Sequence, residues 1–526
     1  MPVKKTLIIP LLGVLLLVRL FSSCIKDPTV LTDESAQLHF SIDTLSFDTV
    51  FTTLGSTTRM VKVYNTYNQP LRIDGVGLLH GSSSRFRLNV DGDTSLWVRR
   101  VNIAAHDSMF VFVQANINPN LSSEPFLITD SIRFNLNGHS QYLPLTAYGR
   151  NAVYHLPTGV LHDNAGGNYP YTVVDCTQWN HTLPHVIFGY AIINEDSVLT
   201  LQAGEELRFA QNSGLIVLAG GSLQASGDMS APILFTSLRH DGRYASLPAQ
   251  WDYIWLAAGS RNNKLEWSIV ENAIAGLRVD TNVNSNPTLR ITNSIVRNHS
   301  VAGILAQGAH IEADNLLVAH CREADVVLRM GGQYRFTHTT IGGYWNYGTR
   351  TSPALIINNW YLASDGSKVL RPISEASFFN SIIYGNYTNS DGLGEVLLDS
   401  TPEAAFNTSF ANCIIQWGKA DTTSMAGQYN QWNINPLFVN PKEGDFHLQT
   451  DSPARGMANS TWTTQPYDLS GTPRPTPAAI GCYEMADTSS VSTQSIFPYS
   501  APTIPRAHHL YQWRYHKALP NLTRPQ

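Results

Sequence analysis

The sequence is poor in charged residues. They make up 14% of the chain, whereas glycine and proline number 37 and 28 among 526 residues, and this composition favours strands and turns over helices. The net charge of −5 offers no basic face to a phosphate backbone, so we expect no general binding of nucleic acid. A chain of this length predicts two or three domains, or fewer if one of them is built from repeats.

Cysteine is scarce as well. The five cysteines contain no CxxC pair and follow no zinc-site spacing, and no glycine-rich loop leads into a helix as it does in nucleotide-binding motifs. We therefore predict neither a metal nor a cofactor. A disulfide remains open for an exported chain, and no pair is indicated among Cys176, Cys321, Cys413 and Cys482.

The apolar run at the N-terminus is too short to span a bilayer. It covers residues 7–18 after Lys4 and Lys5, which is typical of a secretory signal, whereas a spanning helix needs about 20 residues. The next residues, Leu20-Phe21-Ser22-Ser23-Cys24, resemble the lipobox of bacterial lipoproteins, although Phe21 stands where leucine is usual. Ordinary signal cleavage beside a chance cysteine is the alternative.

The lipobox resemblance implies a membrane-anchored protein. Residues 1–23 would be the signal peptide, Cys24 would be acylated, and residues 24–29 would be the tether. Lys26-Asp27 is not an inner-membrane retention signal, so the resemblance implies the outer membrane, on its periplasmic or cell-surface face. Buried acyl chains would supply the membrane affinity.

A six-residue pattern recurs between residues 265 and 415. Its apolar positions alternate with the period of a strand. The first four copies follow one another at similar intervals, and the two wider intervals after them indicate insertions. Such a unit cannot bury its apolar face alone, so we expect stacked neighbours to complete one continuous core. The copies start at Leu265, Ile291, Ala313, Phe336, Phe378 and Phe410.

The third position of the pattern predicts a column of polar side chains. Stacked strands lie about 4.8 Å apart, so side-chain amides can hydrogen-bond from one unit to the next. The column comprises Asn293, Asn315, His338, Asn380 and Asn412. It resembles the asparagine ladder of right-handed parallel β-helix proteins, which implies such a solenoid over residues 197–450. A structural role for His338 is favoured over a role as a catalytic base.

Residues 30–150 follow a different pattern. Alternating runs at 60–64, 86–90, 109–113 and 131–136 are separated by turn residues, and about seven such strands predict a β-sandwich. Asn65, the run Pro70-Leu71-Arg72-Ile73 and the closing Ala147-Tyr148-Gly149 resemble the immunoglobulin-like modules related to sperm-protein and abnormal-spindle domains. Such modules space or dock a larger domain. Residues 151–196 are interpreted as a connector or N-terminal cap.

The C-terminal region resembles a known terminal segment. Asn435-Pro436-Leu437-Phe438, Gly444-Asp445-Phe446, Asp468-Leu469-Ser470-Gly471 and Ile480-Gly481-Cys482-Tyr483-Glu484 follow the order of the choice-of-anchor Q type. This implies a cap over residues 451–484, since an open solenoid end must be covered. Residues 485–526 lack periodicity and are expected to be a disordered tail. The whole chain is predicted to be all-β.

Residues that flank the inward positions of the pattern face outward. One predicted outward column holds Lys264, Arg290, Glu312 and Arg335, and a second holds Glu266, Thr292, Asp314 and Thr337. Together they could form a shallow groove of alternating charge on the scale of an extended sugar chain. A surface ladder of ion pairs, each worth at most about 1 kcal/mol, is favoured over such a groove.

These columns leave three functions open. We expect non-enzymatic binding or adhesion to a polysaccharide or another surface component, by a monomer. The alternative is a polysaccharide lyase or glycoside hydrolase that uses Arg290, Glu312, Asp314 and Arg335, although the repeats contain no Asp-Asp pair and no pectinase motif. A structural envelope protein is the third hypothesis.

Overall fold

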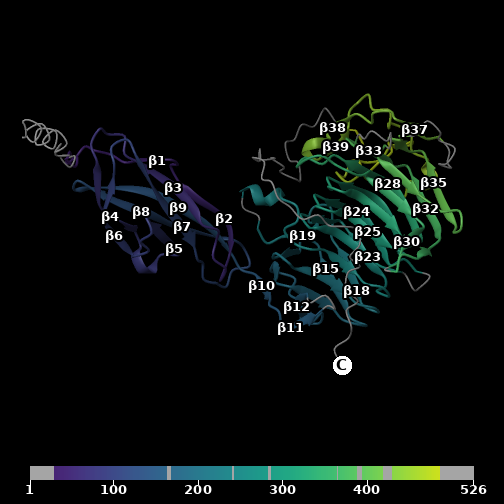
Figure 1. The fold of residues 1–526 in the computed structure, drawn as a ribbon, viewed down its shortest axis with the longest axis horizontal. Helices are drawn as coiled ribbons and strands as arrows, with labels where there is room; N and C mark the ends of the chain where they lie inside the picture. Colours follow the sequence, from purple (N-terminus) through teal and green to yellow (C-terminus); the bar gives the residue numbers. More distant parts are fainter. Residues whose placement is uncertain are drawn as a thin grey trace, which may run out of the picture. The chain divides into compact units, whose positions relative to one another are not determined.

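The computed structural model describes residues 29–162, 167–239, 242–281, 286–363, 365–387, 394–418 and 429–485. The chain divides into two compact units, Met1–Asn151 and Ala152–Gln526. Helix is limited, within the described residues, to four short 3₁₀ segments (Figure 1), which confirms the predicted all-β class for this part of the chain. The 3₁₀ segments are η1 (Gly81–Ser83), η2 (Gly242–Ser246), η3 (Pro441–Glu443) and η4 (Ser460–Trp462).

In the first unit, two sheets enclose one core. The four-stranded sheet has the order β1 (His39–Phe40), β3 (Arg59–Tyr64), β7 (Ser108–Ala115) and β5 (Phe86–Val90). The five-stranded sheet has the order β2 (Leu45–Phe51), β9 (His139–Arg150), β8 (Phe126–Leu136), β4 (Leu71–Leu78) and β6 (Trp97–Ile103). Neighbouring strands run antiparallel, except that β2 is parallel to β9.

The alternation of β7 shows why these strands form. Val111 and Val113 are fully buried, while Phe110 and Phe112 on the opposite face are exposed. Successive side chains of a strand point to opposite faces, so an alternating run places one side in the core. Residues of β3 and β8 reach the same core, among them Val61 and Phe134.

The second unit contains two long sheets in which nearly all pairs are parallel. The main path of the 16-stranded sheet is β10 (Val153–His155), β13 (His185–Ile187), β16 (Glu206–Phe209), β19 (Ile233–Ser237), β22 (Ser268–Glu271), β24 (Leu289–Arg297), β26 (His310–Ala319), β28 (Gly332–Gly343), β33 (Ile382–Gly385), β36 (Ile414–Ile415) and β37 (Gln431–Trp432). Its side branches are β15 (Val198–Gln202), β18 (Ser222–Ser226), β21 (Asn263–Glu266), β32 (Ile373–Phe379) and β35 (Phe406–Ala411).

The second long sheet has ten strands. Its order is β11 (Gly159–His162), β12 (Asn168–Val173), β14 (Tyr190–Ile193), β17 (Gly214–Val217), β20 (Ile254–Leu256), β23 (Ala275–Val279), β25 (Ala302–Gln307), β27 (Ala324–Arg329), β29 (Leu355–Asn358) and β34 (Val396–Asp399). Within this sheet β11 and β12 pair antiparallel. Two small hairpins join β30 (Trp360–Leu362) to β31 (Lys368–Leu370) and β38 (Phe438–Asn440) to β39 (Asp445–Leu448).

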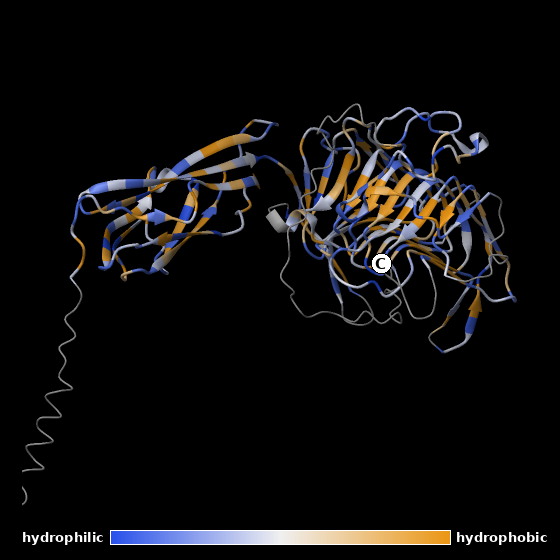
Figure 2. Cartoon of the chain, turned by 90° about the horizontal axis from the view of Figure 1, so that it is seen from above, coloured by the Kyte–Doolittle hydropathy of each residue, from blue (hydrophilic) through white to orange (hydrophobic). Residues whose placement is uncertain are grey.

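The register of the 16-stranded sheet follows the sequence repeat. The six pattern starts are consecutive Cα partners, from Leu265 with Ile291 through to Phe378 with Phe410. Their side chains stack inside the core, where the rings of Phe336 and Phe378 lie 5.0 Å apart and nearly parallel. The apolar positions run along the strands of this unit (Figure 2).

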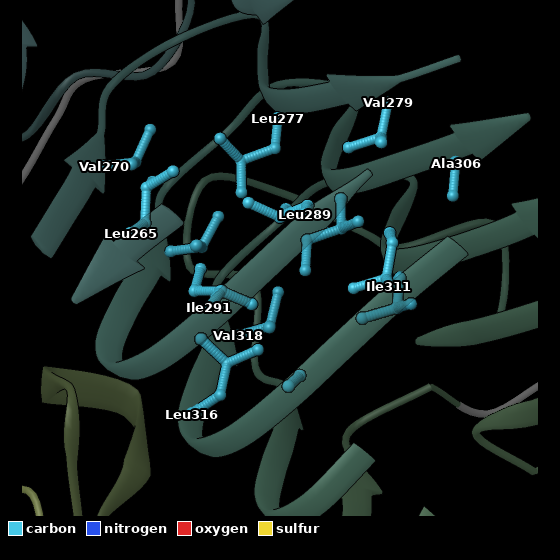
Figure 3. Close-up of a cluster of buried hydrophobic side chains, with 14 of the residues drawn as sticks. Leu265, Val270, Leu277, Val279, Leu289, Ile291, Ala306, Ile311, Leu316 and Val318 are labelled. Carbon is cyan, nitrogen blue, oxygen red and sulfur yellow. The ribbon is translucent and has the colours of Figure 1, made fainter. Parts of the chain in front are cut away.

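Side chains of both long sheets share this core. Figure 3 shows Leu265, Ile291 and Leu289 of the 16-stranded sheet packed with Leu277 and Val279 of the ten-stranded sheet. All five side chains are fully buried. The inward positions of the pattern are therefore those that the sequence predicted.

The column at the third pattern position marks a sharp bend of the backbone. Trp267, Asn293, Asn315, His338, Asn380 and Asn412 all have φ between 43° and 53°, a left-handed conformation that asparagine tolerates better than most residues. The polar column therefore meets a backbone requirement as well as a hydrogen-bonding one.

A second column of the same kind follows the first. Asn272, Asn298 and His320 have φ of 68°, 61° and 58°, and each lies five positions after a member of the first column. Asn298 Nδ2 donates to Asn272 Oδ1 at 2.6 Å. The sequence predicted only the first column, although the second recurs with the same spacing.

The segment predicted as an end cap lies along the flank of the stacked strands. Asn412 donates to Met457 O at 2.8 Å, Asn380 to Asn459 O at 3.0 Å, and Asn315 to Tyr467 O at 3.3 Å. The C-terminal chain thus runs back across successive repeats. It covers an outward apolar row of the sheet, made of Ile269, Ile295, Leu317, Ile382 and Ile414.

Candidate functional site

The first outward column forms a polar stripe on the 16-stranded sheet. Its members are Cα partners across β21, β24, β26 and β28, each one strand from the next. The buried neighbours Leu265, Ile291 and Phe336 point inward, so the column must point outward. The polar stripe comprises Lys264, Arg290, Glu312 and Arg335, whose side chains are 40%, 56%, 41% and 57% exposed.

Each charge of the polar stripe has a partner. Arg290 Nε donates to Glu312 Oε2 at 2.8 Å, and Lys264 Nζ lies 2.6 Å from Glu266 Oε2. Arg335 pairs at 3.3 Å with Glu375 of β32, a residue that the sequence did not single out. Exposed pairs of this kind contribute at most about 1 kcal/mol each, so they can exchange partners for a ligand at little cost.

Asp314 belongs to the second column and is partly covered by the C-terminal segment. Its Oδ2 accepts hydrogen bonds from the Thr464 hydroxyl and, at 3.4 Å, from Gln465 Nε2. Burial raises the pKa of this carboxyl. Glu312 and Asp314 therefore share a face, as their spacing predicts, but Asp314 is engaged by the C-terminal segment. The two acids do not form an open pair of the kind that glycoside hydrolysis uses.

Four members of the polar column at the third pattern position form two short ladders. Asn315 Nδ2 donates to Asn293 Oδ1 at 2.7 Å, and Asn380 Nδ2 donates to His338 Nε2 at 3.1 Å. Between these ladders, Arg474 Nη2 donates to Asn315 Oδ1 at 2.8 Å. The arginine of the C-terminal segment thus hydrogen-bonds to the end of the first ladder, at Asn315.

His338 is enclosed and has partners at both ring nitrogens. Nδ1 lies 3.2 Å from Gly481 O, and Nε2 lies 3.0 Å from Thr463 Oγ1. Burial lowers the pKa of His338 to about 3, and the Arg474 guanidinium acts in the same direction. A neutral, fully engaged imidazole that is closed to solvent suits a structural role better than proton transfer to a ligand.

A buried ion cluster lies at the start of strands β27 and β34, and sequence reasoning missed it. Arg350 Nη1 lies 2.8 Å from Glu395 Oε2, Arg350 Nη2 lies 3.6 Å from Asp325 Oδ2, and all three side chains are at most 1% exposed. Burial raises the pKa of Asp325 to about 7. A Cβ at Gly343 would clash with Arg350 Nη1, so glycine there makes room for the guanidinium. The three side chains are closed to solvent.

No disulfide joins the four described cysteines. Cys176, Cys321, Cys413 and Cys482 are all free thiols, and the last three are buried. Burial raises the pKa of the Cys413 and Cys482 thiols to about 12. They pack as small apolar side chains, which is the usual role of a buried cysteine.

Three predictions for the chain's ends fall outside the described residues, namely the signal peptide over residues 1–23, acylation at Cys24 and, apart from Met485, the tail predicted over residues 485–526. Among the helices that the structure describes, none is long and apolar enough to cross a membrane.

Comparisons with known proteins give little further guidance. No family model matches the chain, and no curated protein matches it. Among solved structures, it has a likeness to a family 123 glycoside hydrolase from Clostridium perfringens, described for glycolipid glycan hydrolysis, with a TM-score of 0.18 and 14% identity. The likeness covers 22% of this chain and 24% of that chain, and it carries no argument about activity.

Proposed function

We propose that this chain is an exported lipoprotein of the outer membrane that binds a polysaccharide, or another extended surface component, without cleaving it. In this proposal an immunoglobulin-like sandwich precedes a right-handed parallel β-helix, and the ligand lies along the polar stripe. The observation that carries the proposal is the stripe itself, in which exposed charged side chains recur one strand apart.

The parallel register supports a β-helix. The chain passes from β24 to β25, then to β26 and β27, so that it alternates between the two long sheets, and each strand pairs with its counterpart one repeat later. The strands of such a stack lie about 4.8 Å apart. In Figure 1 the sequence colours accordingly advance from teal to green along the stack.

The geometry of the stripe supports binding along the stack. The side chains from Lys264 to Arg335 follow one another at the strand spacing of about 4.8 Å, which matches the scale of an extended sugar chain. Arginine presents donors and glutamate presents acceptors, and sugar hydroxyl groups can use both. The existing ion pairs are weak and exposed, so a ligand replaces them without a large loss of stability.

The acids support binding rather than hydrolysis. Glu312 is held by Arg290 at 2.8 Å, and Asp314 by Thr464 and Gln465. Inverting and retaining hydrolysis both need two carboxyl groups that flank the same glycosidic bond. The alternative is a lyase or hydrolase that uses Arg290, Glu312, Asp314 and Arg335. It predicts that polysaccharide is cleaved and that cleavage products can be detected.

The test is a screen of a form of the protein that begins at Ile25 against acidic and neutral polysaccharides, read for retention, new reducing ends and unsaturated-uronate absorbance. We expect retention without product, weakened about tenfold or more in an Arg290→Gln, Arg335→Gln double variant, since each arginine offers charged hydrogen bonds. Arg261→Gln is the matched control, because Arg261 is also exposed and paired, with Asp196 at 2.8 Å.

Two outcomes would overturn the proposal. Product formation that disappears in Glu312→Gln or Asp314→Asn would make the protein an enzyme of the polar stripe. If no polysaccharide is retained and none is cleaved, a structural role or a protein partner is left as the explanation.

A further inference from the structure

A second polar feature lies on the first unit, on the outer face of its five-stranded sheet. It is a hollow of about 700 Å³ lined by Arg72, Asp74, Trp97, Arg99 and Arg100. These residues come from β4 and β6, which are neighbouring strands of the sheet. We call it the arginine hollow. Its volume lies within the range of sites that hold small ligands, about 300–1,000 Å³.

Trp97 forms a fixed aromatic surface in the arginine hollow. It is the Cα partner of Gly77, and a Cβ at either Gly75 or Gly77 would clash with its indole. The ring therefore lies across bare backbone that only glycine provides. The Arg133 guanidinium lies 5.7 Å from the ring centroid and is itself held by Asn135 Oδ1, 2.9 Å from Arg133 Nε. An indole held in this way and still partly exposed offers a rigid stacking surface.

The side chains of the three arginines in the hollow have no partner among the described residues. The side chains of Arg72, Arg99 and Arg100 are exposed, and none of them makes a hydrogen bond or ion pair with any described residue. Arg290 and Arg335 of the polar stripe, by contrast, each hold a carboxylate.

The arginine hollow carries an excess of positive charge. Three guanidinium groups line it together with one carboxylate, that of Asp74. The excess stands out on a chain whose net charge is −5. A concave surface of one sign concentrates ligands of the opposite sign, so the hollow favours an anion.

The chemistry of these groups selects the ligand. A guanidinium holds a carboxylate or sulfate through two parallel hydrogen bonds, while an aromatic face accepts the apolar face of a sugar ring. Asp74 can accept a hydrogen bond from a sugar hydroxyl but would repel a second anion placed beside it. Nucleic acid fits less well, because it requires a basic face much longer than this hollow.

We propose that the arginine hollow binds an acidic glycan. One acidic sugar unit stacks on Trp97, and its carboxylate or sulfate is held by Arg99, Arg100 and Arg72. The site is separate from the polar stripe and does not depend on the function proposed for it. It gives the first unit a ligand of its own, where its sequence indicated only a spacer or docking module.

The test is titration calorimetry on the form of the protein that begins at Ile25. The probes are a galacturonate tetrasaccharide, a heparin tetrasaccharide, a neutral galactose tetrasaccharide and a short DNA duplex. We expect one or both acidic sugars to bind and the neutral sugar to bind at least tenfold more weakly, with an affinity for the acidic probes that falls as salt rises. The two acidic probes distinguish carboxylate from sulfate.

Variants locate the binding. Arg99→Gln and Arg100→Gln remove exposed, unpaired groups, so the fold should tolerate them, and each is expected to weaken acidic-sugar binding about tenfold. Trp97→Ala should weaken it similarly. Arg85→Gln is the charge-matched control, an exposed arginine of the same unit outside the hollow, and should change affinity less than twofold.

A further variant separates the two proposed sites. The Arg290→Gln, Arg335→Gln double variant should retain acidic-sugar binding at the arginine hollow in full. Several results would overturn the proposal: no binding of either acidic sugar, equal binding of the neutral sugar, equal or tighter binding of the DNA duplex, or acidic-sugar binding unchanged in both Arg99→Gln and Trp97→Ala.

Discussion

At the scale of single residues, His338 shows how one substitution in a repeat acquires its own electrostatics. It occupies a position where the neighbouring repeats have asparagine, and it keeps the same left-handed backbone, with φ of 43°. Two partners indicate the tautomer: the Gly481 carbonyl can only accept, from Nδ1–H, and the Asn380 amide N–H donates to Nε2. A proton on Nε2 would face this amide donor instead of an acceptor.

The first prediction concerns the pH dependence of stability in His338→Asn. The pKa of His338 is about 3 in the folded state and about 6.5 in the unfolded state. The free energy of unfolding that depends on a neutral His338 is therefore fully present above pH 6.5 and is lost as the pH falls towards 3. The expected loss is about 1.4 kcal/mol per pH unit in that window. Urea unfolding near pH 7 and pH 5 should show a smaller acid loss of unfolding free energy in the variant than in the wild type.

Comparing the wild type with His338→Asn isolates the effect of His338, because the two proteins share their other buried titratable groups. Burial also lowers the pKa of His299 to about 3 and of His320 to about 4, while it raises the pKa of Asp325 to about 7, which acts in the opposite direction. All three remain in both proteins. An identical acid loss in wild type and His338→Asn would contradict the prediction.

At the scale of elements, the C-terminal segment and the sheet flank depend on each other. The segment covers the outward apolar row that includes Ile295 and Leu317, and burial of such a row is what gives the segment a fixed place. Arg474 fastens it: Nη1 lies 2.8 Å from Glu484 Oε1 and Nη2 donates to Asn315 Oδ1. Both ends of this ion pair are nearly inaccessible, at 1% and 4% exposure.

The second prediction is that Arg474→Met loosens this segment. Removing one partner of a buried pair leaves Glu484 unpaired, and such losses cost about 3–5 kcal/mol. Hydrogen exchange followed by mass spectrometry should show faster exchange over residues 457–483. Arg455→Met is the control, because Arg455 is an exposed residue of the same segment, and it should leave the exchange unchanged. Equal protection in Arg474→Met and wild type would show that Arg474 does not hold the segment.

At the scale of the whole molecule, the chain consists of two units with separate apolar cores. Each is built from strands, but their topologies differ, since the first pairs its strands mainly antiparallel and the second mainly parallel. The proposed anchor lies before both units. Its presence would attach both proposed binding surfaces to a membrane without any contribution from either core.

The third prediction is that Cys24→Ala releases the protein from the membrane. Acyl chains contribute about 0.8 kcal/mol of membrane affinity for each buried CH₂ group, and an alanine at this position cannot be acylated. Fractionation of expressing cells should find the wild type with the outer membrane and the variant in the soluble fraction, and mass spectrometry should find acyl chains on the wild type alone. A variant that still fractionates with membranes, beside a wild type without acyl chains, would refute the anchor.

The strands and the register of the repeats follow from local patterns in the sequence. Alternating apolar residues specify which face of each strand is buried, and a one-residue slip would reverse that face. The starts from Leu265 to Phe410 could therefore be aligned before the fold was known, and so could the outward positions of Arg290 and Glu312. The left-handed bend at Asn293 and its counterparts was not foreseen, because the same asparagines also suit a simple hydrogen-bonded ladder.

Which distant residues meet depends on the path of the folded chain. Arg335 pairs with Glu375 across an insertion, and Asp314 is covered by Thr464. In the first unit, Trp97 comes to lie on glycine backbone of β4 through an antiparallel pairing. Periodicity carries information about neighbours one repeat apart, whereas these contacts depend on where the chain returns after a loop or insertion, and no local pattern encodes that.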